Sequence, residues 1–122
     1  MNNGDGTFTK ITNTVVVQNG GNSHGSSWGD MNNDGHLDLI VSNDQGENNN
    51  MFLNNGDGTF TVSSNTVTSN GGKSFGLALA DIDNDCDLDL HVSNIIDEAN
   101  FMYLNDLSGC NKKVCFTKPP YL

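Results

Sequence analysis

Two stretches of the chain place an oxygen-bearing side chain at nearly every second residue. Residues 81–89 carry five aspartates in alternation, and residues 30–38 repeat the frame 51 positions earlier. Because neighbouring carboxylates repel one another, a short loop holds so many of them only when a cation neutralises their charge. Oxygen donors at this density suit Ca²⁺. The spacing therefore predicts two cation sites, one in each loop.

The acidic loops belong to a longer internal repeat, which sets how they are positioned. Residues 2–9 recur letter for letter as residues 54–61, and four shorter blocks recur in the same order at an offset of 51 or 52. Chance does not align five blocks in order, so the chain contains repeated structural units.

Each unit has the pattern of a β-sheet. Leu37–Val41 and Leu88–Val92 are short and almost continuously apolar, which favours strands that are covered on both faces. Further strands are expected at 26–29, 51–53, 75–80 and 101–104, and after the Asn-Gly-Asp-Gly turns at 3–6 and 55–58. No segment has a helical period of useful length. Four short strands in roughly 50 residues are the size of a propeller blade.

The predicted fold class is all-β, with two four-stranded antiparallel propeller-type blades plus an orphan N-terminal strand. The expected boundaries are an orphan outer strand (7–11) and linker in residues 1–22, a first blade-like repeat at 23–73, a second at 74–118 and a tail at 119–122.

These motifs resemble the FG-GAP/VCBS repeat, the calcium-binding blade of integrin α-subunit propellers and of many bacterial secreted proteins. The resemblance rests on Trp28–Val41, on its copy Leu79–Val92 and on the two Asn-Asn-Gly-Asp-Gly-Thr-Phe segments, and it covers the chain to about residue 104. In that family, loop positions 1, 3, 5 and 9 give side-chain oxygens and position 7 gives a backbone carbonyl. The resemblance therefore implies two Ca²⁺ sites, whose ligands are Asp30, Asn32, Asp34, Asp38 and the His36 carbonyl in one loop, and Asp81, Asp83, Asp85, Asp89 and the Asp87 carbonyl in the other.

Two departures from the family pattern matter. Cys86 stands where a glycine is expected at loop position 6, so its Cβ is expected to strain a turn with positive φ. The family closes propellers of about seven blades, whereas this chain holds two. The rival EF-hand interpretation fails because loop position 12 is Val41 or Val92 rather than glutamate, and strands rather than helices flank the loop.

Charge and cysteine content exclude some classes of partner. The chain has 122 residues, 15 acidic and 5 basic, with a net charge of −10. A nucleic-acid partner is not expected, because phosphate binding needs a basic patch. The sequence contains no run of 18 apolar residues, so no insertion into a membrane is expected. A disulfide between Cys110 and Cys115 is plausible, with two free thiols as the alternative, which leaves Cys86 as a free thiol or an intermolecular link. A local disulfide together with calcium favours an extracellular setting.

No set of residues indicates catalysis. His24 lies in a Ser/Gly stretch, His36 occupies the loop position that uses its backbone carbonyl, and His91 lies in an expected strand. No Gly-x-Ser-x-Gly motif is present. Trp28 either packs between blades or stacks on a sugar.

We therefore expect a non-enzymatic, extracellular structural or adhesive protein stabilised by calcium. A pair of blades leaves two faces bare, so the partners expected are copies of the chain joined head to tail in a ring or a filament, or further blades of a larger secreted propeller. A carbohydrate-binding, lectin-like module is the alternative from another class, with a glycan as its partner.

Overall fold

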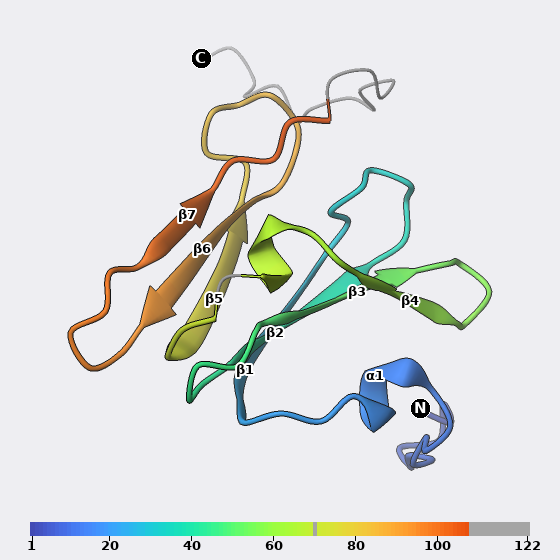
Figure 1. Ribbon diagram of the computed structural model, residues 1–122. Coiled ribbons are helices and arrows are strands. Elements are labelled where there is room, and N and C mark those ends of the chain that lie inside the picture. The colour runs from blue at the N-terminus through green and yellow to red at the C-terminus, as the bar shows by residue number, and fades with distance from the viewer. Residues whose placement is uncertain (70, 108–122) are drawn as a thin grey trace.

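The computed structural model describes residues 1–69 and 71–107, which form two antiparallel β-sheets (Figure 1). Sheet 1 has the order β1 (Ser23–Gly29), β2 (Asp38–Asn43), β3 (Asn50–Asn54), β4 (Phe60–Ser63). Sheet 2 has the order β5 (Ser74–Ala80), β6 (Asp89–Asn94), β7 (Phe101–Tyr103). Each sheet is a meander in which neighbouring strands pair in chain order, as in a propeller blade. The all-β, blade-like prediction is confirmed; the part of the second repeat that follows Leu107 lies outside the described residues.

Two short helical turns interrupt this pattern, and neither was predicted from periodicity. α1 (Val15–Gln18) lies before sheet 1, and the 3₁₀ turn η1 (Thr66–Thr68) lies between β4 and β5. Each begins within a copy of the repeated Asn-Thr-Val motif, at 13–15 and 65–67, so the two turns are equivalent parts of the repeat. Asn65 caps η1 by accepting the N–H groups of Val67 and Thr68. The turns are too short for a 3.6-residue period to be visible in the sequence.

The N-terminal segment differs from the orphan strand expected at residues 7–11. Phe8 forms an isolated bridge with Asn2, and this segment pairs with neither sheet. The hairpin closes on itself, since the Asp5 carboxylate accepts bonds from the N–H and hydroxyl of Thr7 at 2.9 and 2.6 Å. The second copy has the same turn, with Asp57 and Thr59 at 2.9 and 2.6 Å. Residues 2–9 are therefore the structural equivalent of the β3–β4 hairpin end.

The core lies between the two sheets. Ile40 and Met51 of sheet 1 pack with Leu90 and Val92 of sheet 2, and Met31 joins them from the first acidic loop. η1 lies between the sheets in Figure 1, and its Val67 packs on this cluster. The strands begin one residue later than predicted, because Asp38 and Asp89 are their first residues and Leu37 is 58% exposed in the loop.

The sheets approach closely along β1 and β5, where glycine is required. A Cβ on Gly25 would lie 2.9 Å from the carbonyl oxygen of Phe75, and a Cβ on Gly29 would lie 2.7 Å from Leu79 Cδ1. The Ser42 hydroxyl accepts the Gly25 N–H at 2.9 Å and lies 3.3 Å from the Phe75 carbonyl oxygen. The absence of side chains at Gly25 and Gly29 of β1 thus sets the distance between the blades.

In the part of the chain that the structure describes, no helix has the length and apolar character needed to cross a membrane.

Candidate metal centre

The two acidic loops have the same internal hydrogen bonds, so they are two copies of one structure. In the first loop, the Asp30 carboxylate accepts the N–H groups of Asp34 and Gly35 at 3.0 and 2.8 Å. In the second, the Asp81 carboxylate accepts the N–H groups of Asp85 and Cys86 at 3.1 and 3.2 Å. A carboxylate oxygen that accepts one N–H keeps a further lone pair for a cation.

The last aspartate of each loop is buried and oriented by the backbone. Asp38 accepts the N–H of Met31 at 2.9 Å and that of Asn54 at 2.8 Å, and its residue is fully buried. Asp89 is also fully buried and accepts the N–H of Ile82 at 2.8 Å and that of Asn105 at 2.9 Å. Each of these carboxylates therefore ties the start of its loop to the strand that follows, and it holds a negative charge beside the other aspartates.

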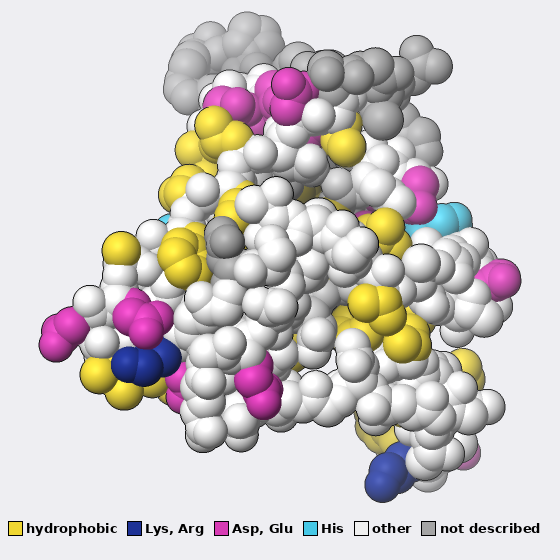
Figure 2. All heavy atoms as spheres, in the orientation of Figure 1, with side chains coloured by type: hydrophobic (Ala, Val, Ile, Leu, Met, Phe, Trp, Pro, Cys, Tyr) yellow, Lys and Arg dark blue, Asp and Glu magenta, His cyan; other side chains and the backbone are white. Residues whose placement is uncertain are grey.

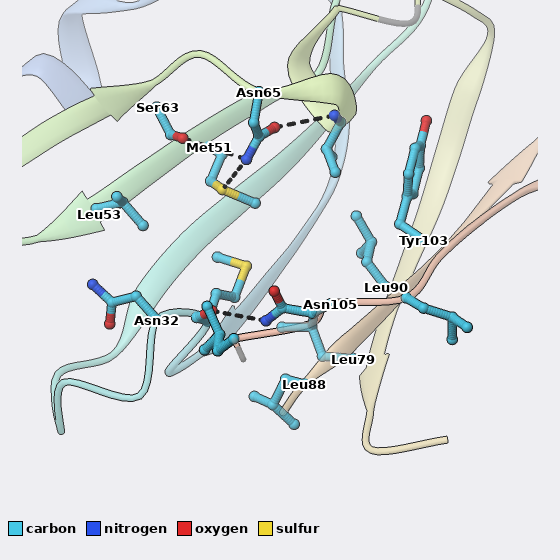
Figure 3. A pocket seen from close by; sticks show the side chains of 14 residues that line it. Asn32, Met51, Leu53, Ser63, Asn65, Leu79, Leu88, Leu90, Tyr103 and Asn105 are labelled. Carbon is cyan, nitrogen blue, oxygen red and sulfur yellow. Dashed lines mark hydrogen bonds between the residues drawn. The ribbon is translucent and has the colours of Figure 1, made fainter. Parts of the chain in front are cut away.

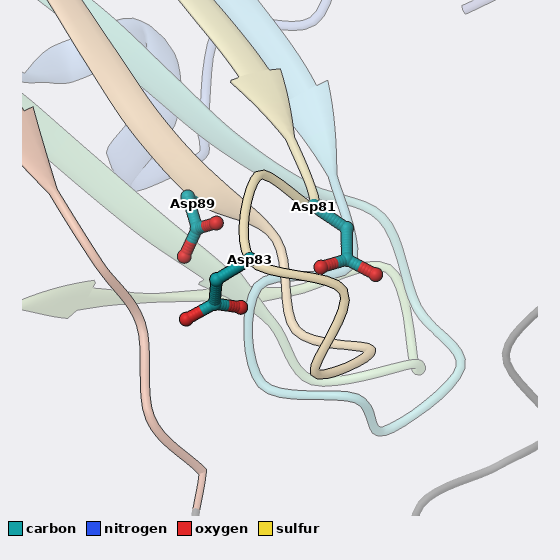
Figure 4. Close-up of side chains that lie close together, drawn as sticks. All are labelled: Asp81, Asp83 and Asp89. Carbon is teal, nitrogen blue, oxygen red and sulfur yellow. The ribbon is translucent and has the colours of Figure 1, made fainter.

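The second loop brings three of its predicted ligands together. One carboxylate oxygen each from Asp81, Asp83 and Asp89 lies within 4.8 Å of the others, and Figure 4 shows the three side chains around the loop between β5 and β6. Ca²⁺ binds oxygen at 2.3–2.6 Å, so two ligands on opposite sides of one ion lie about 4.8 Å apart. The separation and the all-oxygen donor set therefore fit this cation. Asp85 lies outside this group of three, and its Oδ1 accepts the Asp87 N–H at 3.0 Å.

The first loop has an amide where the second has a carboxylate. Asn32 occupies the place of Asp83; its Oδ1 accepts the Asp34 N–H at 3.1 Å and its Nδ2 donates to Asp34 Oδ2 at 2.8 Å. The Asn32 oxygen is thus held inside the loop, as a neutral ligand would be. The His36 N–H donates to Asp34 Oδ1 at 2.8 Å, which matches the Asp87 bond in the second loop.

Burial, together with repulsion between like charges, raises the pKa values of two of these groups. Burial raises the pKa of Asp38 above its ordinary value of 3.8, since desolvation outweighs its backbone hydrogen bonds and Asp34 and Asp30 add repulsion. Desolvation also raises the pKa of Asp83 above 3.8, and repulsion from Asp85 and Asp89 acts in the same direction. Both sites therefore resist full ionisation unless a positive charge is supplied.

The loop backbone passes twice through the left-handed region. Asn33 and Asn84 have φ of 57° and 61°, and Gly35 and Cys86 have φ of 91° and 81°. Asparagine and glycine tolerate this region, whereas a cysteine there is strained. The expectation of a positive φ at Cys86 is confirmed. Cys86 is disulfide-bonded, which rules out the first of its two predicted alternatives, a free thiol. The predicted Cys110–Cys115 pair lies outside the described residues.

Asparagines outside the loops also contribute to the site, and sequence reasoning missed them. Asn54 and Asn105 supply the N–H groups that orient Asp38 and Asp89, and the Asn105 side chain donates to the Met31 carbonyl at 2.9 Å. The repeated Leu-Asn pair at 53–54 and 104–105 was the available signal.

The three histidines lie apart from one another. The His36 ring packs on Gly56, where a Cβ would lie 2.4 Å from its Nε2. His24 Nε2 lies 3.5 Å from Asp44 Oδ2, and its ring lies 4.8 Å from that of Phe75. His91 pairs with Ala78 and Met102 on the sheet 2 face that points away from sheet 1.

A cavity of about 240 Å³ lies between the sheets next to the loops. Its walls are mostly apolar, from Met51 and Leu53 on one side and Leu90 and Tyr103 on the other (Figure 3). Its polar groups are satisfied within the chain, as the hydrogen bonds of Asn65 and Asn105 show. The cavity is part of the contact between the blades.

Comparison with known proteins identifies one family. The model of the FG-GAP-like repeat family matches residues 1–41 and 30–92. No curated protein and no solved structure matches the chain.

Proposed function

Because the chain belongs to the FG-GAP-like repeat family, we propose that it is a calcium-stabilised structural or adhesive module that acts without catalysis, outside the cell, by joining its blades to further blades. The observation that carries this proposal is that the sheet faces buried between the two blades have equivalents at both ends of the pair, and these carry the exposed side chains Trp28, Val62 and Met102.

Calcium would act on the two acidic loops. Asp81, Asp83 and Asp89 provide the oxygen cluster of the second site, and the matching hydrogen bonds of the first loop support a second site at Asp30, Asn32, Asp34, Asp38 and the His36 carbonyl. Bound Ca²⁺ supplies the positive charge that these loops lack. Since each loop joins two strands of a blade, neutralising it stabilises the blade.

The first open face belongs to sheet 1. The cross-strand row Trp28, Leu39, Phe52 is equivalent by the 51-residue offset to the row Leu79, Leu90, Tyr103, which packs against sheet 1. Trp28 is 53% exposed and Val62, at the other end of the same row, is 46% exposed, whereas Leu39 and Phe52 between them are buried. The short helix α1 contacts β4.

The second open face belongs to sheet 2. The row Ala78, His91, Met102 is equivalent to Ser27, Ile40, Met51, and both Ile40 and Met51 are buried under sheet 2. Met102 is 54% exposed in the part of the chain that the structure describes. In the space-filling view, hydrophobic side chains reach the surface at several places among sparse basic ones (Figure 2).

A second copy of this chain is the occupant that these faces fit. Sheet 1 already packs on sheet 2 through Ile40, Met51, Leu90 and Val92, so the same kind of contact can form between the sheet 2 of one copy and the sheet 1 of the next. This contact is heterologous, and it produces a ring if the rotation closes and a filament if it does not.

An extracellular location is supported by the disulfide at Cys86, because such bonds persist in oxidising compartments.

Light scattering on two face variants tests the proposal. Trp28→Glu blocks the sheet 1 face and Met102→Glu blocks the sheet 2 face, so each variant alone should remain at the chain mass of 13.1 kDa in millimolar Ca²⁺, whereas the wild type forms larger particles. An equimolar mixture of the two variants should stop at twice that mass, since each retains one intact face. Ile96→Glu, at an exposed position in the β6–β7 loop, is the control and should assemble as the wild type does.

A stably folded wild-type monomer in Ca²⁺ at micromolar concentration would exclude self-association. It would indicate instead that the open faces receive further blades of a longer propeller.

A second candidate function is glycan binding at the sheet 1 face. Ser23, His24, Ser26 and Trp28 line a shallow hollow there, and an exposed indole beside hydroxyl groups suits stacking on a sugar ring. Trp28 is the sole tryptophan, so its fluorescence should change on titration with mono- and oligosaccharides. No change across such a panel would exclude this function.

A further inference from the structure

The two acidic loops contact each other through two side chains that the predicted ligand sets do not use. The Asn33 side chain projects from the first loop, and its Nδ2 donates to Asp87 Oδ1 at 2.6 Å and lies 3.3 Å from the Cys86 carbonyl oxygen. Asn33 has a left-handed backbone conformation, with a φ of 57°. The first loop thus contributes a hydrogen-bond donor to the second.

Asp87 is the receiving group, and it is 2% exposed. Its other oxygen, Oδ2, accepts the Leu107 N–H at 2.8 Å, and its own N–H donates to Asp85 Oδ1 at 3.0 Å. A buried carboxylate that loses one of its donors is destabilised. The loop segment that offers the Asp87 carbonyl to the second site therefore depends on Asn33 for its position.

A second connection joins the loops through the end of sheet 2. The Asn105 Nδ2 donates to the Met31 carbonyl at 2.9 Å (Figure 3). The Asn105 N–H donates to Asp89 at 2.9 Å, and the Met31 N–H donates to Asp38 at 2.9 Å. The last aspartates of the two loops are thus linked through two residues, Asn105 and Met31.

We propose that the two loops bind calcium as one coupled pair, in which Asn33 of the first loop positions the second through Asp87. Neutralising the first loop fixes Asn33, so the second loop is already partly ordered and loses less conformational entropy when it binds its own ion. By linkage, occupancy of the second loop favours the first by the same factor. This inference rests on the proposed calcium function and adds the order and interdependence of the two sites.

The repeat provides a matched control for Asn33. Asn84 has the equivalent place in the second loop and a similar φ of 61°, but it is exposed and makes no hydrogen bond to the first loop among the described residues. Asn33→Gly and Asn84→Gly both remove the side chain, keep the net charge and tolerate positive φ. They differ in the contact with Asp87 alone.

The test is a Ca²⁺ titration of the full chain, free of reductant, followed by amide NMR. The Gly35 N–H bonds to Asp30 and the Asp87 N–H bonds to Asp85, so each reports the occupancy of its own loop. Coupling predicts that Asn33→Gly raises the half-saturation concentration at the Asp87 reporter about tenfold. Asn84→Gly should leave the Gly35 reporter within about twofold of the wild type.

The outcomes separate this inference from the proposed function. If the wild type saturates both reporters and Asn33→Gly leaves the Asp87 reporter unchanged, coupling through Asn33 is wrong while calcium binding stands. Equal effects of the two variants on the opposite loop would also refute it. If neither wild-type reporter responds to Ca²⁺, the proposed function itself fails. Asn33→Asp, which places a carboxylate against Asp87, serves if Asn33→Gly does not fold, and should raise the Asp87 midpoint further.

Discussion

The distance between the two blades depends on Gly25, and adding a single methyl group there should separate them. The Cβ of an alanine at this position would lie 2.9 Å from the Phe75 carbonyl oxygen and 3.1 Å from the Ser42 hydroxyl oxygen. The Ser42 side chain can rotate away, but the Phe75 oxygen belongs to the backbone of β5. Relief of the clash therefore requires the sheets to move.

The expected magnitude follows from two opposing effects. Overpacking of a close contact by one methyl group costs about 1–3 kcal/mol. Replacing glycine with alanine stabilises by about 0.4–1 kcal/mol, because the unfolded chain has fewer conformations to lose. We expect Gly25→Ala to lower the free energy of unfolding by about 1–2 kcal/mol, which corresponds to roughly 4–8 °C in melting temperature for a domain of this size.

Gly20→Ala is the control, since a Cβ at Gly20 meets no atom within 4 Å. Thermal unfolding by circular dichroism in saturating Ca²⁺ should place Gly20→Ala at or slightly above the wild type and Gly25→Ala several degrees below it. If Gly25→Ala melts at the same temperature as Gly20→Ala, or higher, the sheets do not pack as described.

Two further predictions concern the loops. In metal-free buffer, Asp38 and Asp83 have raised folded-state pKa values, so they bind protons more tightly in the folded chain than in the unfolded one, and their contribution to stability should fall as the pH rises through and above 3.8. Asp5 and Asp57 have lowered pKa values and act in the opposite direction, so the test is the difference between the wild type and Asp38→Asn. Asp38→Asn should lose less stability than the wild type as the pH rises in thermal melts, and identical pH profiles of the two would contradict this. For Cys86→Gly, the direction should depend on the redox state. In reductant it should melt above the reduced wild type, because a side chain at φ 81° costs about 1–2 kcal/mol. Without reductant it should melt below the wild type, because the disulfide that it removes contributes about 2–4 kcal/mol; the same sign in both buffers would refute this.

The sequence predicted the repeated elements well because repetition and alternation are local signals. The two loops, the strand pairs around them and the positive φ at Cys86 all follow from residues within one repeat. The strand at 7–11 failed for a physical reason, because a strand needs a neighbour. The second copy of this segment, β4, pairs with four residues of β3, whereas Phe8 pairs only with Asn2.

Contacts between the repeats were not predictable from these patterns. The bond from Asn33 to Asp87 joins residues 54 positions apart, and that from Asn105 to Met31 joins residues 74 apart. Each depends on how one blade stacks on the other, which no local period encodes. The sequence contains one sign of the contact between the loops: the same loop position is His36 in the first copy and Asp87 in the second.

The most direct test of calcium stabilisation is calorimetric melting of the wild type at pH 7 with 1 mM Ca²⁺, with 1 mM Mg²⁺ and with excess chelator. An ion present at 100 times its dissociation constant stabilises by about 2.7 kcal/mol per site, so two occupied loops should contribute about 5 kcal/mol. The melting temperature in Ca²⁺ should therefore exceed that in chelator by roughly 20 °C. Mg²⁺ should restore little of the difference, because it demands a smaller octahedral site and retains its water. Superimposable melts in Ca²⁺ and chelator would contradict the account.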